Sequence, residues 1–238
     1  MWWHYLTRFR RSAAPPRAAA PNLPLLEHVS DLEPARWLRE SMTTFAQSVA
    51  SLIPGEFESY ARIHHPFEYH DATGRVRSWR EGSELAGVDL TDPAAAEAFA
   101  ERGVNGEQAR VGTLHETLIG PLVEHLGAAT STPGECFFAI WEGFAASAVP
   151  SGLEPRLELP ERRYHLFRGS IEAARTSFSD SPYLGQSANL WWPADHAWCV
   201  ATEVDLAWSY VGGARPLVRA LLADPRLDGV ETTAAARW

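Results

Sequence analysis

The stretch NLWWPADHAWCVATEVDLAWSYVGGARPLVRALL, residues 189–222, carries the strongest structural signals in the chain. Successive side chains of a strand point to opposite faces of a sheet, so residues two apart share a face. One face would carry Trp198, Val200, Thr202, Val204, Leu206 and Trp208. The other face begins with Cys199 and ends with Glu203 and Asp205. We therefore predict one long strand over 198–208 that is covered at its start and acidic on one face at its end.

The residues on either side of this strand predict a turn, a loop and a helix. Pro193, Ala194 and Asp195 favour a tight turn before the strand. Gly212 and Gly213 indicate a loop after it. Pro216 suits the first turn of a helix, and the residues 217, 218, 221 and 222 give that helix an apolar face, which ends before 224–225.

Two chemical features of this stretch are candidates for function. Glu203 and Asp205 are an acidic pair that can serve acid–base chemistry, and the alternative is a solvated strand end. The glycine pair before a helix can hold an anion, and the alternative is a plain connection. The catalytic candidates are Glu203, Asp205 and His196, and the binding candidates are Trp191, Trp192, Asp195, Glu203, Asp205, Gly212, Gly213 and Arg215.

The composition excludes some classes of partner. The 238 residues have a net charge of −9, and all 21 basic residues are arginine. An acidic chain without clustered cations is not expected to bind nucleic acid. Ten tryptophans are an unusually high number, and some of them are expected at a binding surface. Cys136 and Cys199 lie in apolar runs, which favours buried free thiols in the cytoplasm over a disulfide.

The first 22 residues differ from the rest of the chain. They carry a net charge of +4 and end in an alanine- and proline-rich run, which predicts a disordered extension. The alternatives are a start codon chosen too far upstream and an aromatic–basic segment that lies on a membrane surface. We expect one α+β domain over 23–230, in which helices cover a central, mostly antiparallel sheet, and a C-terminal tail over 231–238. No apolar run is long enough to span a membrane.

The middle of the chain supplies further elements. The sequence predicts helices at 31–52, 93–102, 113–127 and 171–178 and strands at 58–63, 135–143 and 163–169. Thr113 and Glu116 form the pattern of a capping box, and 71–112 is expected to be a flexible excursion over the sheet. His64, His65 and His70 lie near Glu68 and Asp71, but their spacing fits no metal motif, so we expect neither a metal nor a cofactor.

Residues 157–174 and 189–222 resemble a family of uncharacterised proteins from GC-rich actinobacteria. The resemblance rests on Leu-Phe-x-Gly at 166–169, Trp-Trp-Pro-Ala-Asp at 191–195, Trp-Cys-Val-Ala-Thr-Glu-Val-Asp at 198–205 and Val-Gly-Gly at 211–213. It implies that 189–222 is a recurring unit and that the first 22 residues lie outside it. The family has no assigned activity, so the resemblance implies no functional residues.

Three hypotheses for function follow from these features. The first is a protein-binding or regulatory module of the immunity kind, which uses an acidic, tryptophan-rich sheet edge to block a partner protein. The alternative is a hydrolase-like enzyme that uses Glu203 and Asp205, with His196 and Arg215 as helpers. The third, a membrane-surface protein, depends on residues 1–11, and we expect no membrane association. The sequence does not define an oligomeric state.

Overall fold

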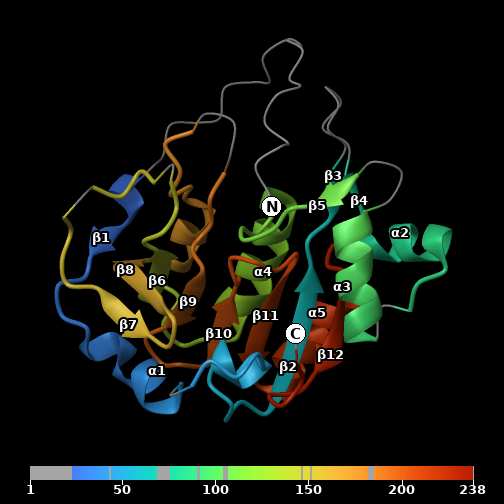
Figure 1. Ribbon diagram of the computed structural model, residues 1–238. Helices are drawn as coiled ribbons and strands as arrows, with labels where there is room; N and C mark the ends of the chain where they lie inside the picture. The colour runs from blue at the N-terminus through green and yellow to red at the C-terminus, as the bar shows by residue number, and fades with distance from the viewer. Residues whose placement is uncertain are drawn as a thin grey trace.

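A nine-stranded antiparallel sheet forms the centre of the computed structural model, which describes residues 23–42, 44–68, 76–89, 92–103, 107–145, 147–150, 152–181 and 185–237 (Figure 1). Eight strands form a continuous path in the order β1 (Glu27–His28), β8 (Arg162–Gly169), β6 (Cys136–Trp141), β9 (Leu190–Pro193), β10 (Trp198–Ala201), β11 (Trp208–Gly213), β2 (Ser59–His64) and β12 (Gly229–Thr232). The ninth, β7 (Leu157–Leu159), pairs with β8. A small second sheet has the order β4 (Val76–Arg77), β3 (Phe67–Glu68) and β5 (Gln108–Ala109).

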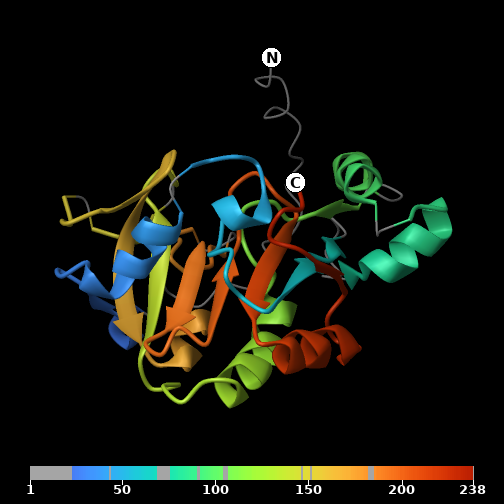
Figure 2. The same cartoon turned by 90° about the horizontal axis from the view of Figure 1, so that it is seen from below.

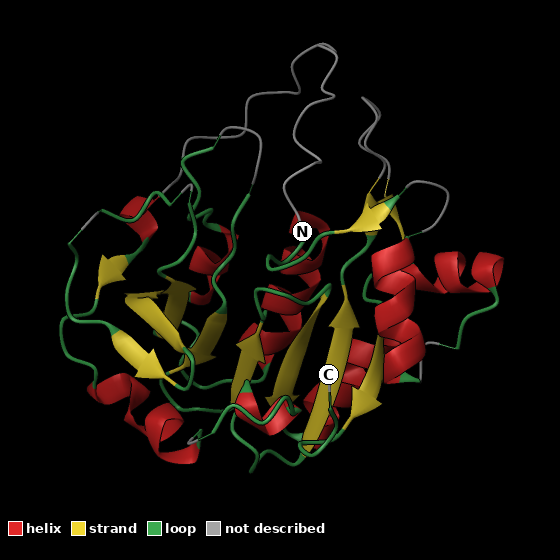
Figure 3. Ribbon diagram, in the orientation of Figure 1, coloured by secondary structure: helices red, strands yellow, loops and turns green. Residues whose placement is uncertain are grey.

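Helices cover the central sheet on both faces (Figures 2 and 3). One face carries α4 (Glu116–Ala128), α5 (Arg215–Ala223) and the 3-10 helix η4 (Ile171–Arg175). The other carries α1 (Arg36–Ser41) with the 3-10 helices η2 (Glu33–Ala35) and η3 (Val49–Ser51). The helices α2 (Trp79–Ala86) and α3 (Pro93–Arg102) lie beyond β2 and β12, and η1 (Leu23–Leu25) precedes β1. The expected α+β class, with a covered antiparallel sheet, is confirmed.

Alternation along the strands divides the buried side chains into two cores. In β6, Phe138 and Ile140 face the α4–α5 core, whereas Phe137 and Ala139 face the α1 core. The strand predicted at 135–143 is therefore covered on both faces, as its apolar sequence indicates. Both cysteines are buried as free thiols, so the alternative of a disulfide is wrong.

The turn and the helix predicted from the 189–222 stretch are confirmed. The β9–β10 hairpin reverses after Pro193, and its strands pair through Val200 and Trp191. Helix α5 has Pro216 in its first turn and ends before Asp224. Its buried residues are Leu217, Val218 and Leu221.

The long strand predicted at 198–208 is wrong, because the chain turns back at Val204–Asp205. Strand β10 ends at Ala201, and β11 pairs with it antiparallel from Trp208 onward. Cross-strand neighbours share a face, and Val200 pairs with Val211. Trp198 and Trp208, predicted on one face, therefore lie in opposite cores.

The loop predicted at Gly212 and Gly213 is also wrong, because both residues lie inside β11. A Cβ at position 212 would lie 2.5 Å from a ring carbon of Phe57, and one at 213 would lie 2.9 Å from Leu217. The two glycines therefore allow close packing on the strand. They do not form an anion-binding loop ahead of α5.

Several other helices begin or end at residues other than those predicted from the sequence. The helix predicted at 31–52 is interrupted after α1, where the Ser41 hydroxyl donates to the carbonyl of Trp37 and Ser48 opens a separate turn. Helix α4 is capped by His115, so the capping box predicted at Thr113 is wrong. The helix predicted at 171–178 is the shorter η4, whereas the strand predicted at 163–169 is confirmed as β8.

The predicted C-terminal tail belongs to the fold. Strand β12 extends through Thr232, and the carbonyls of Ala234 and Ala236 accept hydrogen bonds from Ala50 and Val49. The predicted disordered extension, 1–22, lies outside the described residues. The excursion predicted at 71–112 contains α2, α3, β4 and β5, and its helix at 93–102 is confirmed.

Candidate functional site around Arg162

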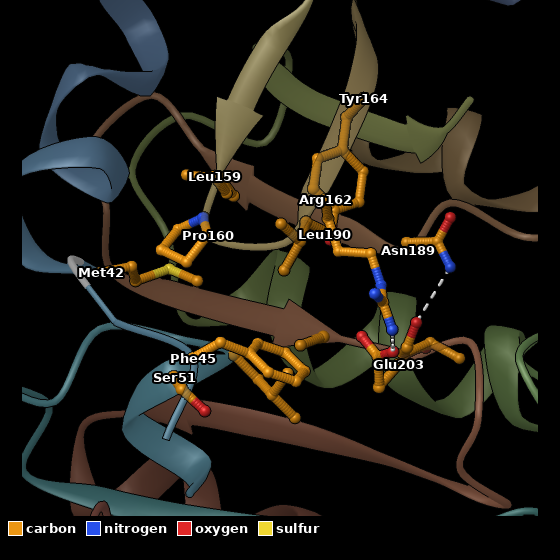
Figure 4. A pocket seen from close by; sticks show the side chains of 13 residues that line it. Met42, Phe45, Ser51, Leu159, Pro160, Arg162, Tyr164, Asn189, Leu190 and Glu203 are labelled. Atoms are coloured by element: carbon orange, nitrogen blue, oxygen red, sulfur yellow. Dashed lines mark hydrogen bonds and ion pairs between the residues drawn. The ribbon is translucent and has the colours of Figure 1, made fainter. Parts of the chain in front are cut away.

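Arg162 joins the β7–β8 turn to the β10–β11 turn. It is the first residue of β8, and its Nη2 donates to Oε1 of Glu203 at 2.6 Å and lies 3.4 Å from Oδ2 of Asp205. Its Nη1 donates to the carbonyl of Glu161 at 3.2 Å. Figure 4 shows the side chain of Arg162 directed at Glu203. One guanidinium therefore fixes the positions of two turns that are distant in sequence.

Two aromatic rings enclose this guanidinium. Its central carbon lies 5.4 Å from the ring centroid of Phe45 and 5.8 Å from that of Trp141. Aromatic faces attract a cation, and the planar guanidinium stacks well on them. Burial lowers the pKa of Arg162, but the hydrogen bond and the charge of Glu203 outweigh burial and raise it. The guanidinium therefore stays charged at the edge of the core.

The cavity beside Arg162 is too small for a substrate. Its volume is about 10 Å³, which is room for roughly one water molecule. Nε of Arg162 is buried without a hydrogen-bond partner in the described part of the chain, so a water there would be well placed to accept from it. The site has the character of a buried ion pair.

The two predicted acids have different environments. The side chain of Glu203 is 3% exposed, whereas that of Asp205 is 77% exposed. Glu203 is committed to Arg162, and Asp205 points outward from the turn. An acid–base pair must face a shared substrate space, and this arrangement provides none.

Asp195 and His196 lie at the opposite end of β10 from Glu203. The carboxylate of Asp195 accepts from the hydroxyls of Thr130 and Ser131 and from the backbone N–H groups of Ser131 and Ala197. Burial raises the pKa of Asp195, but these hydrogen bonds outweigh it and bring the pKa to about 2. His196 has a φ of 55° and stacks on Trp37 with ring centroids 4.3 Å apart. The two residues stabilise the β9–β10 turn, and His196 cannot assist Glu203.

The remaining predicted residues do not form a binding surface. Trp191 and Trp192 are buried in opposite cores, so the expected tryptophan-rich exposed edge is wrong. Arg215 uses its backbone N–H and its Nε to bind Glu58, both at 3.0 Å. Of the predicted set, the structure brings together Glu203 and Asp205. The organising residue, Arg162, was missed, because an arginine at the start of a strand gives no signal of its partner.

His65 and Glu68, two members of the predicted cluster, bond to other groups of the fold. His65 hydrogen bonds to the carbonyl of Arg110 and to Ser209, and Glu68 pairs with Arg110 at 2.7 Å. Across the described residues, no group of three His, Cys, Asp or Glu side chains is arranged to hold a metal ion. His70 and Asp71 lie outside the described residues.

Comparisons with known proteins give no relative for this chain, since no family model, curated protein or solved structure matches it. Within the part of the chain that the structure describes, none of the helices has the length and apolar character needed to cross a bilayer. Function must therefore be argued from the described geometry alone.

Proposed function

We propose that this chain is a protein-binding, regulatory module of the immunity kind, which recognises a basic segment of a partner. The proposed contact surface is the acidic end of the sheet, formed by Phe45, Pro160, Glu161 and Asp205. The observation that carries the proposal is that Asp205 is 77% exposed yet lies 3.4 Å from Arg162, whose side chain is only 19% exposed. An exposed charge with a fixed position can bind a partner without first being ordered.

The charge balance of this end favours a cationic partner. Arg162 is the cation that contacts both turns, and its charge is matched by the buried Glu203, whereas the charge of the neighbouring Arg163 is paired with Glu142. Asp205 and Glu161 therefore add negative charge to a chain whose net charge is already −9. Such a field attracts a basic partner, speeds association and disfavours acidic ones. The partly buried Phe45 ring beside Arg162 supplies an apolar contact at the same place.

The test is capture of a partner by the full chain from a lysate of a GC-rich actinobacterium. The baits are the wild type, Asp205→Lys and, as a matched control, Glu101→Lys, which reverses an exposed acid on α3. Asp205→Lys should lower the melting temperature only slightly, because its side chain is 77% exposed and its 3.4 Å contact with Arg162 is a weak surface ion pair. The captured protein is identified by mass spectrometry, and its affinity is then measured with purified components.

We expect one protein to be captured stoichiometrically by the wild type and by Glu101→Lys. Asp205→Lys should weaken its binding by roughly tenfold or more, and the affinity of the wild type should fall as salt is added. Equal binding to all three baits, or no stoichiometric partner for any of them, would remove the acidic end as a recognition surface.

A further inference from the structure

The imidazole of His64, at the end of β2, is buried and has no hydrogen bond to any of the described residues. It is 1% exposed, and neither ring nitrogen has a partner among the described residues. Its ring stacks on Trp79, with centroids 4.3 Å apart and planes 9° apart. The adjacent His65, in contrast, uses both of its ring nitrogens. Buried polar groups are nearly always hydrogen-bonded, so an imidazole whose two ring nitrogens both lack a hydrogen-bond partner indicates a site for a bound molecule.

His64 is one of the residues that line a cavity of about 250 Å³ between the starts of α2 and α4 and the segment after α5. A cavity of this size suits a fragment-sized organic molecule. Trp79, Val76 and Leu118 supply apolar wall area. The cavity shares no lining residue with the one beside Arg162. What binds there is therefore independent of the proposed protein-binding function.

The charged groups at the cavity differ in how firmly they are held. Arg226 is fully engaged with Asp224 and Glu124 at 2.7 Å each. Asp228 accepts from the backbone N–H of Arg80 at 2.7 Å and so caps the start of α2. The guanidinium of Arg80 is 63% exposed and approaches Asp228 at only 3.4 Å. A bound anion can draw the guanidinium of Arg80 away from this long contact, because the 14% exposed Asp228 keeps its hydrogen bond from the Arg80 backbone.

The protonation state of His64 defines what it can bind. Burial lowers the pKa of His64 well below its ordinary value, and the Arg62 and His65 charges act in the same direction. A neutral imidazole has one N–H donor and one acceptor nitrogen. A hydroxyl group, which both donates and accepts, is its natural complement.

We propose that this cavity binds a small hydroxylated carboxylate, with its hydroxyl on His64, its apolar body against Trp79 and Leu118, and its carboxylate toward Arg80. Each of the three features of the cavity then has a matching part of the ligand. The proposal concerns binding alone and includes no chemical step.

The test uses 4-hydroxybenzoate as the probe, with benzoate and phenol as matched compounds that lack one polar group each. Binding to the full chain is measured by calorimetry and by the nitrogen NMR signals of the histidine rings. The wild type should bind 4-hydroxybenzoate roughly fivefold more tightly than either matched compound. Binding should also shift the ring nitrogen signals of His64.

Two variants separate the contribution of His64 to the binding affinity from that of Arg80. His64→Phe keeps the stack on Trp79 and should make the affinities for 4-hydroxybenzoate and benzoate equal. Arg80→Met should make the affinities for 4-hydroxybenzoate and phenol equal. Arg102→Met, at an exposed arginine on α3, is the control and should bind as the wild type does.

Three outcomes would overturn the proposal. The first is that the wild type binds 4-hydroxybenzoate no more tightly than the matched compounds or does not bind it at all. The second is binding that leaves the His64 ring nitrogen signals unshifted, a reading that needs no variant and holds if His64→Phe fails to fold. The third is a folded His64→Phe protein that keeps the preference for the hydroxyl compound.

Discussion

Replacing Arg162 with methionine should cost about 3 kcal/mol of the free energy of unfolding. The change leaves the Glu203 carboxylate, 3% exposed, without its cation, and breaking a buried pair costs about 3–5 kcal/mol. We expect the lower end of this range, because Arg162 is itself 19% exposed and water can reach its place. The loss of the aromatic contacts with Phe45 and Trp141 is part of the same cost.

The matched variants complete a double-mutant cycle. Glu203→Met should cost about 1.5 kcal/mol, because Arg162 keeps Asp205 and some solvent. The double variant should also cost about 1.5 kcal/mol, because two apolar side chains replace a desolvated pair. The coupling energy is then about 3 kcal/mol, at the top of the range for residues in contact.

Urea unfolding at neutral pH, followed by fluorescence, measures all four proteins. A cost below about 1 kcal/mol for Arg162→Met would show that the pair behaves as a solvated surface ion pair. A double variant as unstable as the two single variants added together would show that Arg162 and Glu203 do not act as a unit. Either result would remove the physical basis for a fixed Asp205 turn.

Three further results are expected. Asp195→Asn should lower the free energy of unfolding by about 1 kcal/mol at neutral pH, a figure reduced because the carboxylate is exposed. The pKa of Asp195 is about 2 in the folded protein and 3.8 in the unfolded chain. The difference between variant and wild type should therefore disappear in acid-unfolding curves as the pH falls from about 4 to about 2. Gly212→Ala should cost about 1–3 kcal/mol in thermal unfolding, because the new methyl group would lie 2.5 Å from the Phe57 ring, and adding Phe57→Leu should restore part of the loss. Neither cysteine should react with a thiol reagent in the native state, because both thiols are buried. Burial raises the pKa of the Cys199 thiol, and burial together with the charges of Asp195 and Glu135 raises that of the Cys136 thiol to about 12. Rapid reaction of one thiol before urea is added would contradict this expectation.

Local patterns predicted the elements whose signals are themselves local. The apolar run of β6, the proline and aspartate of the β9–β10 turn and the proline at the start of α5 each specify structure within a few residues. Periodicity also identified core residues where it mistook the element. Leu38, Met42 and Val49 are buried although no single helix joins them. The reason is that burial depends on the spacing of apolar residues over short stretches. The length of a helix depends in addition on where side chains compete for the hydrogen bonds of its backbone.

The β10–β11 hairpin was missed because its turn contains neither glycine nor proline. The residues Glu203–Leu206 close the turn through a backbone hydrogen bond, and the apolar alternation continues through it unbroken. What holds this turn is Arg162, 41 residues earlier in the chain. The sequence of the turn does not show that an arginine in another strand holds it. The wrong prediction of one long strand and the failure to identify Arg162 at the site therefore have the same cause.

Two adjacent histidines show that the hydrogen-bond partners of a single side chain also cannot be predicted from the local sequence. His64 and His65 are the same residue type at adjacent positions, yet the ring of His65 bonds to Arg110 and Ser209, whereas the ring of His64 stacks on Trp79 and has no hydrogen bond among the described residues. The two partners of the His65 ring lie 45 and 144 residues away in the sequence. Which histidine is satisfied is therefore decided by the packing of remote strands and helices. The unpaired ring nitrogens of His64 are therefore information that composition and spacing lack, and because buried polar groups are nearly always satisfied, an unsatisfied ring beside a satisfied one favours a site for a bound molecule.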